Sequence, residues 1–227
     1  MNKPQIIVRS CLGCYNLFKV LWEEIMRLVL GSDLHGYLPK VPSCDILILA
    51  GDLLPETDQE RFIDQFLRRW LNDVPAKEVV ATWGNHDDQP FRRWNYKLRW
   101  HLLIDQSVTL AGLKFHGTPW CLPVGRWAWQ APEYVLEKIY AMIPDDTNIL
   151  ISHTPPHGIC DKTAPEKGSE NVGSFALRDR LASLPNLKLV VCGHIHEARG
   201  QSGIVMNVSS VDRDRNLRKD PWVVMDI

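Results

Sequence analysis

The sequence predicts an α/β fold whose sheets contain both parallel and antiparallel strands. Short apolar runs of strand length alternate with amphipathic helical stretches and are joined by short links, which is the pattern of a parallel α/β layer. Residues 102–118 instead hold short runs separated by turns, a hairpin pattern that indicates antiparallel pairing. Polar residues follow directly after several apolar runs, and α/β sheets of this kind bind their ligands at that end of the strands.

The composition fits one globular domain. The chain has 227 residues, of which 45% are hydrophobic, and this is enough for a sizeable core. The formal net charge is -1, so no basic excess argues for bulk binding of nucleic acid. No apolar run reaches the roughly 18 residues needed to span a membrane.

The cysteines indicate a reducing, cytoplasmic setting without a disulfide framework. Cys44 and Cys192 border or lie within strand-like apolar runs, where buried free thiols are common. Cys11 and Cys14 have the spacing of a redox or zinc motif, but no second pair follows at zinc-ribbon spacing. We therefore do not interpret this pair as a functional site.

The first 25 residues fit poorly with the rest of the chain. Leu17, Val20, Leu21 and Ile25 match one face of a short amphipathic helix, and no signal-peptide cleavage site follows the apolar run. A first strand begins close to Met26. We interpret residues 1–25 as an N-terminal extension, either an accessory helix or an over-extended start, and residues 26–227 as the functional domain.

The first part of this domain predicts two strands, a helix and a third strand. The strands lie at 27–30, 44–50 and 79–83, and the run at 44–50 is almost continuously apolar, like a strand buried on both faces. The helix is expected from about residue 58 to 71. Its periodicity places five apolar residues on one face: Phe62, Ile63, Phe66, Leu67 and Trp70.

The second part continues the alternation. After the hairpin region comes a loop rich in Trp and Pro at 119–129, followed by a helix at about 133–142 and a strand at 148–152. A long polar loop at 157–172 leads to a helix at about 175–184 and a strand at 187–191. The apolar runs at 204–208 and 222–225 predict closing strands.

Residue types that bind metal ions stand at the ends of these predicted strands. They are Asp33, His35, Asp52, Asn85, His86, His153, His194 and His196, and they include five of the chain's eight histidines. Each motif alone also fits a polar turn or a packed histidine, but their repetition behind several strands favours a metal site. Imidazole, carboxylate and amide oxygen suit zinc, manganese or iron rather than calcium. Seven candidate ligands are too many for one ion and suit two ions that share a carboxylate.

The same residues, in the same order, resemble the motifs of the calcineurin-like metallophosphoesterase superfamily. The matching segments are Asp33-Leu34-His35, Gly51-Asp52, Gly84-Asn85-His86-Asp87, His153 and Gly193-His194-Ile195-His196. The resemblance spans residue 26 to about residue 210, and every motif position is filled. Residues 117–120, 152–158, 172–174 and 193–197 further resemble the small metallophosphoesterase-domain phosphodiesterases.

The resemblance implies a four-layer α/β/β/α sandwich of two mixed sheets flanked by helices. It implies two divalent ions, with manganese, iron, zinc and nickel as the candidates. The first ion would be held by Asp33, His35, Asp52 and His196, and the second by Asp52, Asn85, His153 and His194, with Asp52 bridging. His86 would protonate the leaving oxygen or stabilise the transition state, and Asp87 would orient His86.

These features together predict a phosphodiesterase that hydrolyses a small nucleotide or similar ester. A phosphomonoesterase or protein phosphatase is the alternative on the same site, and a non-catalytic scaffold is the alternative of another class. The candidates for substrate contacts are Trp120, His157 and Lys162. An aromatic face such as that of Trp120 can stack on a base, although the tryptophans of its loop can equally cover a sheet. We expect neither a nucleic acid nor a membrane as partner, and the oligomeric state stays open.

Overall fold

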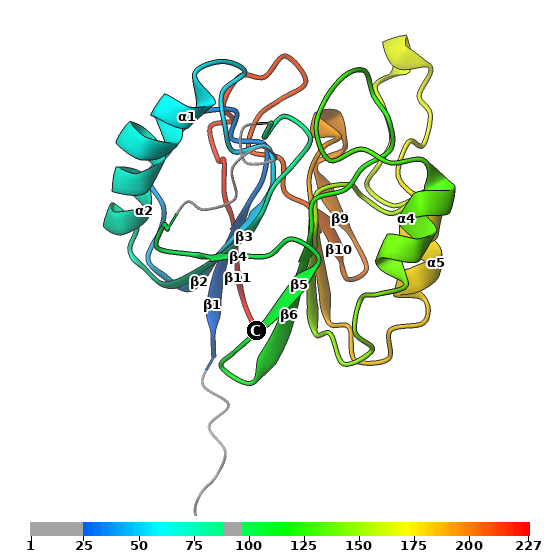
Figure 1. The fold of residues 1–227 in the computed structure, drawn as a ribbon, viewed down its shortest axis with the longest axis horizontal. Coiled ribbons are helices and arrows are strands. Elements are labelled where there is room, and N and C mark those ends of the chain that lie inside the picture. The colour runs from blue at the N-terminus through cyan, green and yellow to red at the C-terminus, as the bar shows by residue number, and fades with distance from the viewer. Residues whose placement is uncertain (1–24, 89–96) are drawn as a thin grey trace, which may run out of the picture.

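The computed structural model describes residues 25–88 and 97–227. Two β-sheets lie face to face, and helices cover the outer face of each sheet, as Figure 1 shows. This arrangement confirms the predicted α/β/β/α sandwich. The predicted N-terminal extension lies outside the described residues except for Ile25, and so does the Cys11–Cys14 pair.

The first sheet has the strand order β11-β1-β2-β3-β4. Its parallel strands are β1 (Arg27–Gly31), β2 (Cys44–Ala50), β3 (Ala76–Thr82) and β4 (His101–Leu102). The edge strand β11 (Val223–Asp226) pairs antiparallel with β1, which makes the sheet mixed. Strand β3 begins before the predicted run at 79–83, because Ala76 already pairs with Cys44 of β2.

The second sheet has the order β5-β6-β7-β8-β10-β9. Strands β5 (Gln106–Leu110) and β6 (Leu113–Thr118) form the predicted hairpin. Strand β6 then pairs in parallel with β7 (Ile149–Ser152), and parallel pairing continues to β8 (Leu189–Cys192) and β10 (Val205–Asn207). Strand β9 (Gly200–Ser202) closes the edge antiparallel to β10.

The strands are apolar at successive positions because both faces of each sheet are covered. In β1, Leu28 and Leu30 pack between the two sheets, whereas Val29 packs in the layer beneath the helices of the first sheet. In β7, Ile149 and Ile151 face the first sheet, whereas Leu150 packs with the helices of the second sheet. Alternate residues of a strand point to opposite faces, so both positions are buried.

The first sheet is covered by α1 (Gln59–Phe62), the π-helical segment η1 (Ile63–Leu67) and α2 (Arg68–Asp73). The second is covered by α4 (Glu133–Tyr140) and α5 (Phe175–Leu181), and short 3-10 turns occur at η2 (Pro165–Lys167) and η3 (His196–Ala198). In the described ranges, no helix combines the length and the apolar character needed to cross a bilayer.

The helix before β3 corrects one prediction. Phe66 was expected on the buried face, but its side chain is 49% exposed. The buried positions are Gln59, Ile63, Leu67 and Leu71, which are four residues apart. A π turn holds more residues than an α turn, so positions four apart stay in line and Phe66 is rotated outward.

The cysteines within the described ranges carry free thiols. Cys44, Cys121 and Cys192 are buried, and Cys160 is partly buried. Burial raises the pKa of the Cys44 thiol to about 11, so this group stays protonated near neutral pH.

Candidate metal centre

The predicted ligands converge where parallel strands of both sheets end. Asp33, His35, Asp52 and Asn85 follow strands of the first sheet, and His153, His194 and His196 follow strands of the second. Six of them form two groups, Asp33–His35–His196 and Asp52–His153–His194, and in each group one ligand atom per residue lies within 4.8 Å of the others. Asn85 lies beside the second group, with its Oδ1 2.9 Å from His153 Nε2. The candidate centre is therefore assembled across the two sheets.

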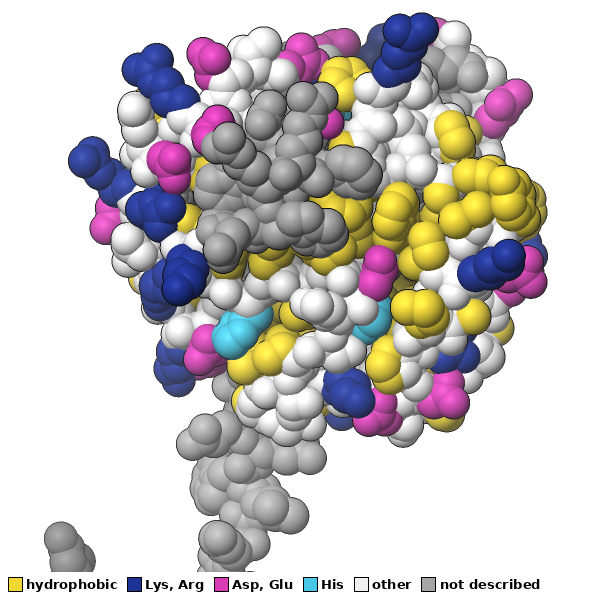
Figure 2. Space-filling model, in the orientation of Figure 1, with side chains coloured by type: hydrophobic (Ala, Val, Ile, Leu, Met, Phe, Trp, Pro, Cys, Tyr) yellow, Lys and Arg dark blue, Asp and Glu magenta, His cyan; other side chains and the backbone are white. Residues whose placement is uncertain are grey.

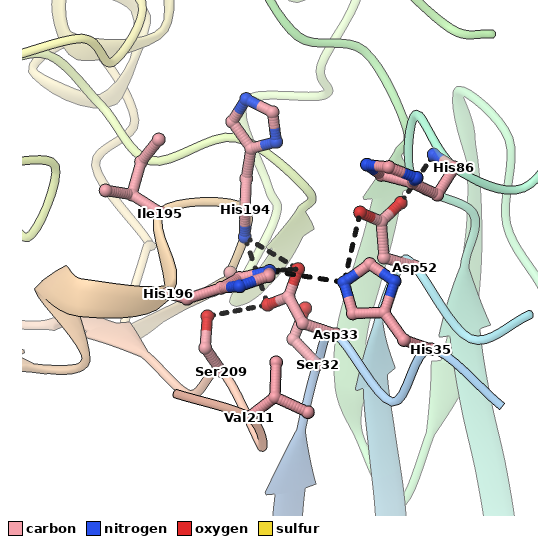
Figure 3. A network of polar contacts seen from close by, with 12 residues as sticks. Ser32, Asp33, His35, Asp52, His86, His194, Ile195, His196, Ser209 and Val211 are labelled. Atoms are coloured by element: carbon pink, nitrogen blue, oxygen red, sulfur yellow. Dashed lines mark hydrogen bonds and ion pairs between the residues drawn. The ribbon is translucent and has the colours of Figure 1, made fainter. Parts of the chain in front are cut away.

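In the first group, two imidazole rings face each other beside two carboxylates. His35 Nε2 lies 3.2 Å from His196 Nε2, and His196 Nε2 lies 3.5 Å from Asp33 Oδ1. Asp52 Oδ2 lies 3.9 Å from His35 Nε2. Figure 3 shows the His35 ring between the Asp52 carboxylate and the His196 ring.

In the second group, His153 is fixed by a backbone contact that sets which nitrogen faces the site. Its Nδ1 lies 3.0 Å from the carbonyl oxygen of Ala50, so this nitrogen carries the donated hydrogen. Its Nε2 then faces Asn85 Oδ1 at 2.9 Å and Asp52 Oδ1 at 3.4 Å. A hydrogen-bonded Nδ1–H with a free Nε2 is the usual arrangement of a metal-binding histidine.

Asp52 lies between the two groups. Its Oδ1 faces His153 and its Oδ2 faces His35. Oδ1 also accepts a hydrogen bond of 2.8 Å from the backbone N–H of His86, which fixes the carboxylate. A carboxylate shared by two ions needs this position.

The separations between the candidate ligand atoms fit small divalent ions. Bonds of about 2.0–2.1 Å to a tetrahedral ion place neighbouring ligand atoms about 3.3–3.4 Å apart. Four measured separations, 3.2, 3.4, 3.5 and 3.9 Å, lie around this value. The residues present therefore fit ions bound through imidazole nitrogen and carboxylate oxygen.

The charges of the buried groups are strongly coupled. Burial alone would raise the pKa of Asp33 and Asp52, but the imidazoles of His196 and His153 outweigh it and lower both pKa values. Burial likewise opposes protonation of His153, yet the charge of Asp52 raises its pKa to about 9. The space between Asp52 and His153 therefore attracts a cation, which is a proton or a metal ion.

Two other imidazoles of the centre, those of His35 and His194, are held neutral. Burial lowers the pKa of His35 to about 4, and burial together with the charge on His153 lowers the pKa of His194 to about 3. A neutral imidazole keeps a lone pair, which is the form that binds a metal ion.

The backbone at the centre is strained in a way that concentrates ligands. Asp33, His35, Asp52 and His194 have φ between 43° and 68°, a left-handed region that non-glycine residues rarely adopt. Glycine at position 193 permits close approach, because a Cβ there would lie 2.3 Å from Asp33 Oδ2. These loops therefore adopt unfavourable backbone conformations at the positions that bring the candidate ligands together.

Two residues near the end of the second sheet support the ligands and were missed from the sequence. Ser209 Oγ donates a 2.6 Å hydrogen bond to Asp33 Oδ2. Asn207 Nδ2 donates to the carbonyl oxygens of Gly193 at 3.2 Å and Ile195 at 2.9 Å, which braces the loop that carries His194 and His196. Neither residue belongs to a recognisable local motif.

Asp87 does not orient His86 as predicted. Its carboxylate accepts hydrogen bonds from the backbone N–H groups of Leu53 at 3.0 Å, Leu54 at 2.9 Å and Gly84 at 2.8 Å. Burial raises the pKa of Asp87 to about 8. Asp87 therefore ties the loop after β2 to the loop after β3, and His86 has other neighbours.

The His86 ring lies at the edge of the candidate centre. Its Nε2 is 3.1 Å from Nη2 of Arg215, and its ring centroid is 5.0 Å from that of His35 and 4.0 Å from that of Trp127. Burial, reinforced by the charge of Arg215, lowers the pKa of His86. The sequence did not indicate Arg215, because no motif surrounds it.

The three predicted substrate contacts have partners of their own in the structure. Trp120 donates a 2.7 Å hydrogen bond to Asp105 and packs edge-on against Trp129. His157 stacks on Phe175 with ring centroids 3.6 Å apart. Lys162 forms an isolated antiparallel β-bridge, through its backbone, with Asn171 in the loop after β7. Trp127, from the same Trp-rich loop, contacts His86 instead.

Comparison with known families decides how this centre is interpreted. The model of the calcineurin-like phosphoesterase family matches residues 7–198. The chain belongs to this family. All residues of the two candidate ligand groups lie within the matched range.

Several curated proteins share part of their length with this chain. Human metallophosphoesterase domain-containing protein 1 is 30% identical over 205 residues, which cover 77% of this chain and 61% of that protein. A probable rhamnogalacturonate lyase C of Emericella nidulans is 29% identical over 205 residues, which cover 83% of this chain and 19% of that protein. A 3′,5′-cyclic-nucleotide phosphodiesterase of Nostoc sp. is 25% identical, covering 69% and 57% respectively.

A solved structure shares the fold. The phosphopantetheinyl hydrolase of Mycobacterium tuberculosis superposes with a TM-score of 0.56 at 19% identity, covering 87% of this chain and 95% of that one. At this identity the likeness shows the fold alone. This chain spans about three fifths of the human relative, which has further sequence of its own.

Proposed function

We propose that the protein is a phosphodiesterase that uses two divalent ions to hydrolyse a small nucleotide or similar phosphate ester. The observation that carries this proposal is the position of Asp52, whose two oxygens face His153 and His35 on opposite sides. When bound, two such ions supply an activated water and positive charge for the phosphate oxygens. Water would attack phosphorus in line with the leaving oxygen.

Some residues of this chain would hold the metal ions, and others would act on the substrate. The buried ligands set the place of the ions, and Ser209 and Asn207 fix the loops that carry those ligands. His86 would give a proton or a hydrogen bond to the leaving oxygen, since its ring lies beside the candidate ligand His35 and also contacts the exposed Trp127. Asp87 accepts a hydrogen bond from the backbone N–H of Gly84 and so fixes the loop that carries His86.

A nucleotide is favoured as substrate by the aromatic surface next to His86. Trp127 is 42% exposed and lies 4.0 Å from the His86 ring, so it offers a flat face for a base beside the leaving group. A relative is named as a cyclic-nucleotide phosphodiesterase, which supports a diester. Figure 2 shows acidic and basic side chains interspersed on the visible face, which does not favour a long nucleic acid.

A phosphomonoesterase is the second candidate, and Arg215 favours it. The second negative charge of a monoester would suit a guanidinium at the edge of the centre. A screen of bis-p-nitrophenyl phosphate against p-nitrophenyl phosphate, with manganese, nickel, zinc and magnesium in turn, separates the two. We expect the diester to have the higher kcat/KM. A higher value for the monoester would reverse the assignment, and no turnover with any metal would favour the scaffold.

Manganese is the metal that we propose, because carboxylate, amide and imidazole ligands all suit it. We propose a reducing, cytoplasmic setting, since the described cysteines are free. Residues 1–25 contain no predicted ligand, and we propose that residues 26–227 suffice for catalysis.

A further inference from the structure

Arg215 lies beside the candidate centre without belonging to its ligands. Its Nη2 is 3.1 Å from Nε2 of His86, and its Nη1 pairs with the carboxylate of Glu56. The Arg215 side chain is 38% exposed, so a molecule entering the centre can reach it. A guanidinium only donates hydrogen bonds, and therefore His86 Nε2 is the acceptor here.

The turn that carries Arg215 is held in a defined shape. Val211 and Leu217 form an antiparallel bridge at its base. The Asp212 carboxylate accepts hydrogen bonds of 2.9 Å from the backbone N–H groups of Asp214 and Asn216. Arg215 itself has φ 62°, a left-handed backbone conformation that non-glycine residues rarely adopt.

The same turn is tied to the loop of a candidate ligand. Arg218 Nη2 donates a 2.9 Å hydrogen bond to the carbonyl oxygen of His196, and Arg218 Nε donates to the carbonyl oxygen of Val211 at 2.9 Å. The position of Arg215 is therefore coupled to the first ligand group. A residue held in this way is preorganised for a contact at the centre.

A fixed cation next to two divalent ions is unfavourable unless an anion joins them. Glu56 supplies one negative charge on the outer side of Arg215, but its side chain is 55% exposed and the pair is weakened by solvent. A phosphate group carries more charge, and its oxygens match the planar donors of a guanidinium. The arrangement selects an anion of this chemistry.

We propose that Arg215 binds a phosphate oxygen of the substrate, and that Glu56 holds the guanidinium in place until the substrate takes it over. The identity of the anion as an ester substrate rests on the proposed function. Transfer of Arg215 to the phosphate frees the lone pair on Nε2 of His86, which can then take up a proton from water and pass it to the leaving oxygen. Substrate binding and the availability of His86 are thereby linked.

The experiment measures binding of inorganic phosphate to the manganese-loaded protein by calorimetry. Arg215→Gln should weaken phosphate binding about 10- to 100-fold, the usual effect of losing a charge-assisted hydrogen bond. Arg213→Gln is the matched control, because Arg213 lies on the same turn but pairs with Glu166. It removes the same charge and should change phosphate binding less than about twofold. Both variants should keep the metal content of the unmodified protein.

Glu56→Gln removes the holding carboxylate and should tighten phosphate binding, by up to about fivefold. Arg215→Lys keeps the charge but loses the planar donors, so its affinity should lie between those of Arg215→Gln and the unmodified protein. This variant also serves if Arg215→Gln does not fold.

Equal losses in the Arg213 and Arg215 variants would overturn the inference in favour of a general charge effect. Unchanged binding in Arg215→Gln, or a manganese-loaded protein that binds no phosphate, would also overturn it. Because the measurement does not need turnover, it separates two failures. A protein that hydrolyses no ester but still depends on Arg215 for phosphate would refute the proposed function and leave this inference standing.

Discussion

The candidate centre has two regions that are built in opposite ways. We call the seven candidate ligands, which are buried or partly buried, the floor: Asp33, His35, Asp52, Asn85, His153, His194 and His196. We call the side chains at its edge the rim: Glu56, His86, Trp127 and Arg215. Asp33 is fully buried, whereas Trp127 is 42% exposed.

The contacts of the two regions differ as much as their exposure. Floor residues are bonded to the backbone of distant loops, as Asp33 is to the N–H of His194 and His153 is to Ala50. In the rim, Arg215 bonds to both Glu56 and His86. The side chains of Arg215 and Glu56 are 38% and 55% exposed, so their pair is weak, whereas His86 itself is buried. The floor is thus fixed before the substrate arrives, whereas the rim can rearrange around it.

Gly84→Ala should have the largest effect, because it damages the floor without removing a ligand. A Cβ at this position would lie 2.3 Å from Asp52 Oδ1 and 2.6 Å from His153 Cε1, so both side chains must move. A misplacement of this size costs at least about 10²-fold in activity. The kcat/KM and metal content of purified protein measure it.

Gly200→Ala is the matched control, since the nearest atom to an added Cβ there is 3.9 Å away. It should keep activity and metal content. A Gly84→Ala protein with normal activity would show that the floor is softer than its packing indicates.

His86→Asn tests the rim and should have the next largest effect. General acid catalysis contributes typically about 10²–10⁴-fold, and an ester with a poor leaving group needs it most. The rate should fall steeply on an alkyl or nucleoside ester and much less on a nitrophenyl ester, with metal content unchanged. Equal losses on both esters would favour simple phosphate binding, and loss of metal would place His86 in the floor.

Ser209→Ala should lower activity less, and excess metal should restore the activity. Ser209 Oγ bonds Asp33 directly, and removing such a supporting contact typically costs about 10- to 100-fold in metal affinity. Activity measured against manganese concentration should show a shifted midpoint and an unchanged maximum. Ser210→Ala is the control, because Ser210 Oγ bonds the carbonyl oxygen of Pro221 instead. The same shift in both variants would contradict the support role.

Trp127→Ala should have the smallest effect and only on esters that carry a base. Loss of stacking at its lower limit raises KM about fivefold. An alkyl ester without a ring should show no change, and Trp127→Phe should keep most of the affinity because it retains an aromatic face. A rise in KM for the alkyl ester would mean that Trp127 acts through the position of His86.

The comparison also explains what could be predicted from the sequence. Each floor residue follows an apolar strand, so strand pattern and residue type were enough to find it, and the structure gathers all seven. The assignment of strands to two sheets came from the family resemblance, because the change to a hairpin pattern at residue 102 indicates antiparallel pairing but does not show that β4 ends one sheet and β5 begins another.

Apart from His86, the rim and the supporting residues could not be predicted in the same way. Ser209 lies 176 residues from its partner Asp33, and Arg215 lies 129 residues from His86, so only the fold brings them together. Trp120 and Trp127 belong to one Trp-rich loop and looked alike, yet Trp120 bonds to Asp105 whereas Trp127 contacts His86. Phe66 was misplaced because a π turn leaves no clear mark in the residue pattern.

The central claim is that Asp52 is shared by two metal ions, and metal content per chain tests it most directly. Elemental analysis of manganese-loaded protein after removal of free metal should give about two ions per chain. His196→Ala and His194→Ala should each lose about one, and Asp52→Asn should affect both and fall below one. One ion per chain in the unmodified protein, or an Asp52→Asn protein that keeps one full ion, would contradict the shared site.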